Sequence, residues 1–154
     1  MIWARFWDVD ESAYQPPTKL QQMPSWLLSR AAMAGDRLVT ATLAESGLRK
    51  HHFTALLALA EVPGLSQAGL GRRLGLDVSD VHAVVGLLEE RGYVGRARDP
   101  GDRRRNVLHP TAAGKRELAR LERRVLAAQQ ELLAPLSDSA RRQLVAALET
   151  LVVG

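Results

Sequence analysis

Apolar residues recur with helical spacing over most of the chain. From Ser25 onward they return every three or four residues as far as Gly47, which ends the first predicted helix. A second helix is predicted over roughly residues 50–60, before a Pro-Gly turn. Residues 1–24 instead mix aromatic, acidic and proline residues without a sustained period, so we expect an irregular N-terminal arm there.

Two shorter helices and a hairpin are predicted next. Ser66 is a suitable N-cap for a helix over residues 67–74, which a glycine then closes. After a tight turn, a helix over about residues 79–91 places apolar side chains at i, i+3, i+4 and i+7. Residues 93–98 and 105–108 have the composition of two short strands around a polar turn. The sequence therefore predicts helix, turn, helix and hairpin in immediate succession.

The C-terminal part predicts two more helices. Thr111 can cap a long helix in which apolar residues return at alternating three- and four-residue steps. Pro135 interrupts this pattern, and Ser137 can cap a further helix with one apolar side. Packing within one chain would explain the apolar seam, but a narrow stripe on a long terminal helix favours a dimer, in which the seam needs a partner. The seam residues are Leu118, Leu121, Val125 and Leu132.

Positive charge is concentrated in one part of the sequence. The 154 residues include 21 Lys+Arg and 17 Asp+Glu, and the surplus lies mostly between Arg91 and Arg124. Such a local field favours a polyanion such as DNA phosphate. The hairpin turn contains Arg103, Arg104 and Arg105 in a row. An isolated run of this kind is typically a solvated turn, but the neighbouring helices and strands favour DNA contact.

Several classes of function are disfavoured by what the sequence lacks. It has no cysteine, which excludes disulfides, thiolate metal sites and thiol redox switches. No enzyme motif is present, so we expect no enzymatic activity, no cofactor and no metal. Gly69, Gly71 and Gly75 do not have the spacing of a phosphate loop, and close helix packing is the expected reason for the two that lie inside the helix, Gly69 and Gly71. Without an apolar signal-peptide core or a bilayer-length apolar segment, a soluble cytoplasmic protein without membrane contact is expected.

The motifs around the hairpin resemble the MarR (multiple antibiotic resistance regulator) family of transcription regulators. That family's wing reads approximately D-P-x-D-x-R, followed by a strand and by T-x-x-G at the start of a helix. This chain has Asp99-Pro100-Gly101-Asp102-Arg103-Arg104 and then Thr111-Ala112-Ala113-Gly114. Segments 65–75 and 87–94 are similar to the family's first motif helix and to the end of its recognition helix. In element order the resemblance extends over residues 25–153.

The resemblance implies a mainly α-helical winged helix-turn-helix fold with a small β-hairpin wing and with N- and C-terminal dimerisation helices. After the arm (1–24), the dimerisation helices would be 25–48 and 111–154, and the DNA-binding domain 49–110. A homodimer of this kind places its recognition helices in successive major grooves of a pseudo-palindromic operator in double-stranded DNA, about 10 base pairs apart.

Individual residue roles are implied by position in the same motifs. Arg104 matches the family's wing arginine and lies between Arg103 and Arg105, while Asp99 and Asp102 are expected to shape the turn. Asp80 is a departure, because a carboxylate can accept from cytosine N4 but otherwise repels phosphate, and base readout is therefore expected to be sparse. The residues that match the base-facing part of the recognition helix are Ser79, Asp80, His82 and Ala83.

In similar proteins the first two helices border a cleft for small effectors, often aromatic and anionic. The candidates for that pocket are Trp26, Arg30, His51 and His52. Surface or capping positions are the alternative for the histidines, and ordinary helix packing is the alternative for Trp26. The predicted function is a sequence-specific, DNA-binding repressor that a small effector releases. The alternatives are an effector-independent DNA-binding module and a protein-interaction scaffold on the same fold.

Overall fold

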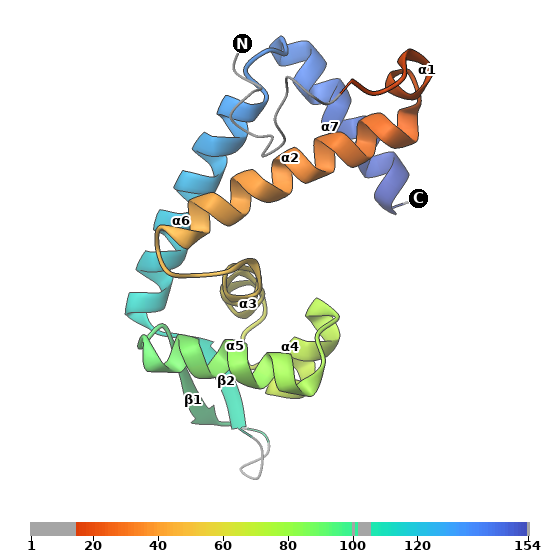
Figure 1. Ribbon diagram of the computed structural model, residues 1–154. Coiled ribbons are helices and arrows are strands. Elements are labelled where there is room, and N and C mark those ends of the chain that lie inside the picture. The colour runs from red at the N-terminus through yellow and green to blue at the C-terminus, as the bar shows by residue number, and fades with distance from the viewer. Residues whose placement is uncertain (1–14, 100, 102–105, 154) are drawn as a thin grey trace. The chain divides into compact units, whose positions relative to one another are not determined.

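The computed structural model describes residues 15–99, 101 and 106–153 (Figure 1). Helices make up most of this part, and two antiparallel strands form a hairpin between the fifth and sixth helices. This order confirms the expected mainly α-helical class with a small β-hairpin. The elements are α1 (Thr18–Gln21), α2 (Pro24–Ala44), α3 (Lys50–Glu61), α4 (Gln67–Leu74), α5 (Val78–Glu90), β1 (Val94–Arg98), β2 (Asn106–Pro110), α6 (Ala112–Leu132) and α7 (Asp138–Val153).

The chain divides into two compact units. One comprises residues 40–125, here called the winged unit, and the other comprises residues 1–39 and 126–154, here called the terminal unit. The winged unit is longer than the expected segment 49–110, because the end of α2 and the first half of α6 contribute to it. Leu43 on α2 and Leu121 on α6 have no exposed surface, so both act as core residues.

The core of the winged unit is formed by α3, α4, α5 and the hairpin, which contact one another. On α5 the buried side chains are the four that the helical period predicts, and they are β-branched or leucine residues typical of a core-facing stripe. The largest fully buried side chains of the structure all lie in this unit. They are Leu43, Leu48, Leu56, Leu59, Leu70, Leu88, Leu108, Leu121 and Val85.

Helix α4 is bounded by two caps and makes a close contact with the segment that follows it. The Ser66 hydroxyl accepts a hydrogen bond from the Gly69 backbone N–H (3.1 Å), as its predicted N-cap role requires. Gly75 ends α4 with a φ of +65°, a left-handed conformation that favours glycine. A Cβ on Gly71 would lie 3.1 Å from both the Leu76 carbonyl oxygen and a Val81 methyl group, which confirms close packing as the reason for that glycine.

The hairpin strands pair from Val94 with Pro110 to Arg98 with Asn106. The second strand thus extends two residues beyond its predicted end, where Pro110 can occupy the last pair because it needs no donor at a strand end. On the edge of β2 that faces away from β1, the Leu108 N–H donates to the carbonyl oxygen of Leu65 (2.8 Å). This hydrogen bond connects the hairpin to the segment before α4.

In the terminal unit, helices α1 and α7 lie near the two chain ends. The short helix α1 falls within the arm that we expected to be irregular; four residues are too few to show a period, and the Gln21 side chain stabilises the turn by donating to the Pro16 carbonyl oxygen (2.7 Å). Ser137 caps α7 as predicted, accepting from the Ala140 N–H (3.3 Å). In the part of the chain that the structure describes, no helix is long and apolar enough to cross a membrane.

The hairpin and α6 meet at a point of backbone contact. The Thr111 hydroxyl donates to the Gly92 carbonyl oxygen (2.6 Å) and accepts from the Gly114 N–H (3.0 Å), so it joins the turn before β1 to the first turn of α6. The Thr111 N–H also donates to the Tyr93 carbonyl oxygen (2.9 Å). A Cβ built on Gly114 would lie 2.0 Å from that same oxygen, so no side chain fits there.

Replacement of Gly114 by alanine therefore tests this joint. The added methyl group can fit only if the backbone of Tyr93 or α6 moves, so we expect Gly114→Ala to lower the free energy of unfolding by about 3 kcal/mol. Gly86→Ala is the matched control, because Gly86 is exposed on α5 with no atom near its Cβ position. It should raise stability by up to about 1 kcal/mol. Urea denaturation of both variants measures the difference in the free energy of unfolding. Equal stabilities would contradict the close backbone contact at Gly114.

Candidate nucleic-acid interface

The outward face of α5 is exposed along its first two turns. The structure places Ser79, Asp80, His82 and Ala83 on this face, and the buried stripe of α5 on the opposite one. Helix α5 begins one residue before the predicted start, at Val78, which is 88% exposed and was not among the predicted site residues. Aspartate is a preferred N-cap residue, so Asp77 was the signal for the earlier start.

Asp77 fixes the beginning of α5. One of its carboxylate oxygens accepts from the Asp80 N–H (2.8 Å) and from the Ser79 hydroxyl (2.7 Å). The backbone bond from Asp80 and then the hydroxyl bond from Ser79 favour the ionised carboxylate, which lowers the pKa of Asp77. Since the Ser79 hydroxyl proton points to Asp77, the Ser79 oxygen presents its lone pairs to an incoming ligand.

An open hollow lies between α4 and the start of α5. Val78, Ser79 and His82 line it from α5, and Gln67 and Arg72 line it from α4. Arg72 is exposed and makes no hydrogen bond or ion pair within the described ranges, so its guanidinium is available to an anion. The first two turns of the candidate recognition helix thus face the same space as a cation of the preceding helix.

A charged contact holds the hairpin against α5. Arg96 on β1 donates from Nε to one Glu89 oxygen (2.6 Å) and from a terminal nitrogen to the other (2.9 Å), and it also contacts the Gln67 side-chain oxygen (3.3 Å). The hydrogen bonds from Arg96 lower the pKa of Glu89. This bidentate pair orients strand β1 relative to both helices. Sequence reasoning missed it, because the three residues lie on three elements with no common motif.

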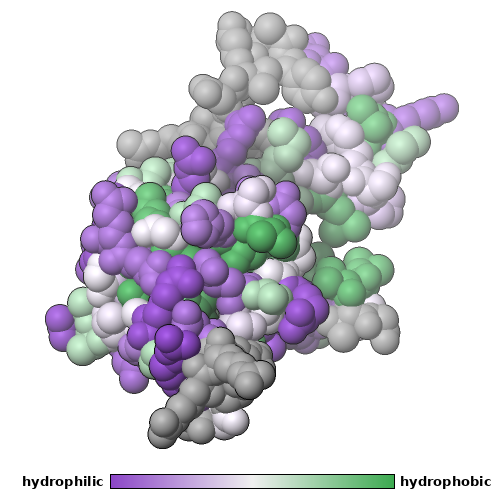
Figure 2. Space-filling model, turned by 90° about the horizontal axis from the view of Figure 1, so that it is seen from below, coloured by the Kyte–Doolittle hydropathy of each residue, from purple (hydrophilic) through white to green (hydrophobic). Residues whose placement is uncertain are grey.

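At the hairpin tip, the structure describes only part of the predicted site. The Asp99 carboxylate accepts from the Gly101 N–H (2.9 Å), which supports its predicted turn-shaping role. Asp102 and the wing arginines 103–105 lie outside the described residues, and their roles stay predictions. Figure 2, which views the molecule from below, shows mostly hydrophilic side chains with hydrophobic patches among them.

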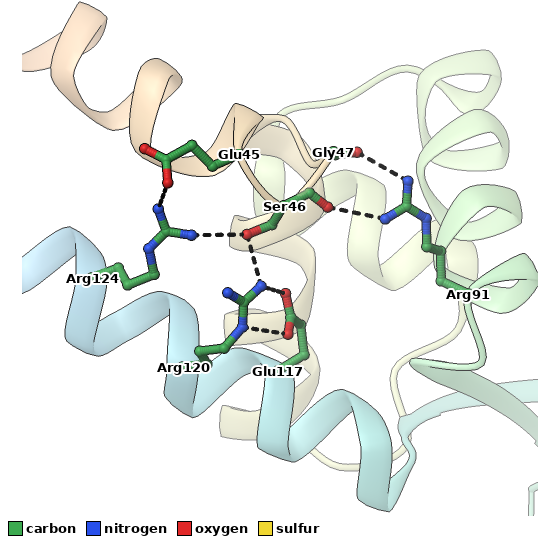
Figure 3. Close-up of polar contacts among 7 residues, drawn as sticks. All are labelled: Glu45, Ser46, Gly47, Arg91, Glu117, Arg120 and Arg124. Carbon is green, nitrogen blue, oxygen red and sulfur yellow. Dashed lines mark hydrogen bonds and ion pairs between the residues drawn. The ribbon is translucent and has the colours of Figure 1, made fainter.

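Three of the arginines in the basic stretch have structural contacts to the turn between α2 and α3 (Figure 3). Arg91, at the end of α5, donates to the Ser46 carbonyl oxygen (3.0 Å) and contacts the Gly47 carbonyl oxygen (3.5 Å). From α6, Arg120 and Arg124 both donate to the Ser46 hydroxyl, at 2.8 and 3.4 Å. The positive surplus between Arg91 and Arg124 is therefore only partly available to DNA.

Two carboxylates neutralise part of this cluster. Glu117 pairs with Arg120, one turn away on α6 (2.7 Å), and Glu45 at the end of α2 pairs with Arg124 (Figure 3). The pairing with Glu117 raises the pKa of Arg120. The turn at Ser46 is thereby connected to the end of α5 and to α6.

The effector-pocket candidates divide between the two units. Trp26 and Arg30 both lie on α2 in the terminal unit, with the Arg30 guanidinium carbon 5.6 Å from the centre of the Trp26 ring, a cation–π distance. His51 is exposed, whereas His52 is buried at the start of α3. Its Nδ1 accepts from the Arg49 N–H (2.9 Å), so the capping alternative describes His52.

The predicted dimer seam on α6 needs correction. Leu118, Leu121 and Val125 are 6%, 0% and 7% exposed within a single chain, so these three side chains do not need a partner subunit to cover them. The helical period identified the buried side of α6 correctly, but periodicity alone cannot tell intrachain from interchain packing. Leu132 lies beyond the winged unit and is half-buried.

Two helices joined by a tight turn, with the second exposed and a hairpin fixed beside it, define the winged helix-turn-helix class. The sequence matches the model of the MarR family over residues 46–105. It is 37% identical over 125 residues to a putative transcriptional regulatory protein for the hcr operon of Thauera aromatica, covering 80% of this chain and 75% of that protein. It is 32% identical over 126 residues to the HTH-type transcriptional repressor Rv2887 of Mycobacterium tuberculosis, covering 82% and 91%.

Solved structures agree with these relatives. The repressor CouR bound to a 23-mer DNA duplex is similar with a TM-score of 0.77 and 28% identity, over 90% of this chain and 99% of that one. CouR of Rhodococcus jostii RHA1 bound to p-coumaroyl-CoA is similar with a TM-score of 0.71 and 31% identity, over 88% and 95%. The chain belongs to the MarR family, as the motif resemblance implied. It is a DNA-binding transcription regulator, and the family is not a class of enzymes.

The cap at His52 predicts a pH dependence of stability. Burial, and then the positive charges of Arg49, His51 and Arg91, lower the pKa of His52 below its ordinary value. The folded state therefore favours the neutral ring, and the resulting stability is present above about pH 6.5 and lost as the pH falls below it.

We expect His52→Ala to lower the free energy of unfolding by about 1 kcal/mol near neutral pH, because the Arg49 N–H loses its acceptor. The difference from the original protein should shrink as the pH falls below about 6.5, because protonation of the ring removes the same acceptor. Urea titrations at several pH values measure this, with His82→Ala, at an exposed position on α5, as the control. A difference that stays constant with pH would refute the neutral cap.

Proposed function

We propose that the protein binds a pseudo-palindromic operator as a homodimer and represses transcription until a small effector releases it. The observation that carries this proposal is the exposed face of α5, which Asp77 fixes at its start and which the Arg96–Glu89 contact orients relative to the hairpin. A recognition helix in the major groove needs a fixed orientation relative to the wing. The helix must contact base edges while the wing contacts the DNA backbone.

Phosphate contacts are proposed for exposed cations around that face. Arg72 borders the hollow between α4 and α5, and Lys115 and Arg116 are exposed near the start of α6. We assign Arg103, Arg104 and Arg105 to phosphate or minor-groove contact at the hairpin tip. The similar repressor CouR has been solved bound to a 23-mer DNA duplex, which supports DNA binding by this fold.

A homodimer is supported by the apolar surface of the terminal unit. Among the described residues, ten large hydrophobic side chains are exposed, and only Val78 belongs to the winged unit. No described side chain of α7 is buried, although the helix has an apolar side. Many exposed large apolar side chains on one unit are typical of an interface, and a second copy of the chain would cover them. The nine residues are Met23, Leu27, Leu28, Met33, Leu126, Val145, Leu148, Leu151 and Val152.

Release by a small aromatic or anionic effector is supported by the relatives. CouR has been solved with p-coumaroyl-CoA, and the PcaV regulator of Streptomyces coelicolor with its natural ligand. A ligand that binds the DNA-free form better lowers operator affinity by that difference. We keep Trp26, Arg30 and His51 as candidate contacts and assign His52 to stabilising α3.

Operator binding is tested by selection from randomised duplexes at about 50 and 200 mM salt, where counterion release makes affinity fall steeply. We expect an enriched palindrome, and titration of the retained complex with p-coumaroyl-CoA should release the DNA. Arg104→Ala should weaken binding to the enriched duplex by about 1–3 kcal/mol and flatten its salt dependence.

The control for this variant is Arg142→Ala, which removes the same charge from an exposed position on α7. It should leave affinity and salt dependence unchanged. Absence of an enriched sequence at either salt concentration would refute operator binding and favour a protein-interaction scaffold. Unaltered binding by Arg104→Ala would refute the role of the wing, and DNA binding insensitive to p-coumaroyl-CoA would refute that probe as the effector.

The proposed dimer surface is tested on α7. The variant Leu148→Glu/Leu151→Glu introduces two charges on its exposed apolar side, which a partner subunit would have to bury unpaired. We expect sedimentation velocity to show a folded monomer in place of a dimer. Glu149→Lys, between the two positions, is the control and should remain dimeric. A double variant that remains dimeric, or an original protein that is monomeric, would count against this surface. Leu121→Glu, by contrast, should unfold the winged unit, because Leu121 is buried within a single chain.

A further inference from the structure

Helix α5 has an unusual set of side chains for a recognition helix. Residues 78–90 include no lysine or arginine, and they include three acids. The commonest specific contact to a base pair, from arginine or lysine to guanine, is therefore unavailable to this helix. Its exposed face must read bases by other chemistry.

Val78 provides one such chemistry. Its side chain is 88% exposed, and it is the only large apolar side chain exposed among the described residues of the winged unit. It occupies the first position of α5, next to the Asp77 cap, and it borders the hollow with Ser79 and His82. Single exposed apolar residues are common on proteins, but this one lies where a recognition helix meets base edges.

An apolar group in the major groove has one distinctive partner, the C5-methyl group of thymine. Resting on the DNA-binding role proposed above, we propose that Val78 determines operator specificity by packing its methyl groups against the C5-methyl of one thymine in each half-site. The Asp77 cap fixes the backbone at Val78, so the position of the isopropyl group is set before DNA binds. The contact adds no charge, so it contributes selectivity without changing the salt dependence of binding.

The test compares duplexes that differ by a methyl group alone. In the enriched operator, each thymine is replaced in turn by deoxyuridine, which lacks the C5-methyl but pairs identically. Affinity for the original protein and for Val78→Ala is measured by fluorescence anisotropy. At one symmetry-related pair of positions we expect the original protein to lose roughly 4-fold in affinity per half-site, the factor that corresponds to one methyl group.

For Val78→Ala, binding to the unmodified operator should weaken, and the deoxyuridine effect at that position should fall below about 2-fold. Val78→Thr, which keeps one methyl group, should be intermediate. Because the side chain is exposed, unfolding of all three proteins should coincide. Deoxyuridine at the remaining thymines serves as the internal control and should affect the two proteins equally.

The outcomes separate this inference from the proposed function. Selective, salt-dependent binding in which no thymine shows the effect, or in which Val78→Ala retains it in full, would overturn the role of Val78 while leaving operator binding intact. Failure of the original protein to select any sequence would overturn both.

Discussion

The close approach of Gly114 to the Tyr93 carbonyl oxygen is the constraint on which the arrangement of the wing depends. At this joint the backbone of α6 lies against the turn that enters β1, and the Thr111 hydroxyl bonds both sides of it. Because backbone meets backbone, the joint has no rotamer freedom with which to adjust. The T-x-x-G motif thus has a physical meaning: threonine joins the two segments, and glycine permits their contact.

The arginines of this chain divide into two groups with different tasks. Arg91, Arg120 and Arg124 converge on the turn at Ser46, and Arg96 binds Glu89, so these four hold elements of the winged unit together. Each ion pair is partly exposed and contributes little to the free energy of unfolding. A bidentate pair nevertheless fixes the relative orientation of the two side chains that form it. Net charge alone would assign all of them to DNA. Their contacts show that the local positive surplus overestimates the charge that a duplex would meet.

The sequence was sufficient for the order and type of the main elements, because their signals are local. Ser66 and Ser137 have the cap roles predicted for them, and the stripe on α5 is buried as its period requires. Contacts between distant segments were not predictable, and the Arg96–Glu89–Gln67 contact is the clearest example. The α6 seam was misassigned for a related reason: a hydrophobic period gives the buried side of a helix, but not the identity of the chain that covers it. Val78 was missed because the Asp77 cap was taken as part of the turn.

A recognition helix without cations separates affinity from selectivity. In the proposed complex, phosphate contacts from the hairpin and from exposed cations on α4 and α6 would supply attraction that every sequence offers equally. The exposed face of α5 has an apolar group at Val78, a hydroxyl oxygen at Ser79 and a carboxylate at Asp80. None of these groups attracts the phosphates of the DNA backbone. Asp80 adds repulsion toward phosphate unless an amino group of a base faces it. In the proposed complex, such a helix would discriminate as much by the bases it rejects as by those it binds, and we expect a correspondingly lower affinity for non-specific DNA.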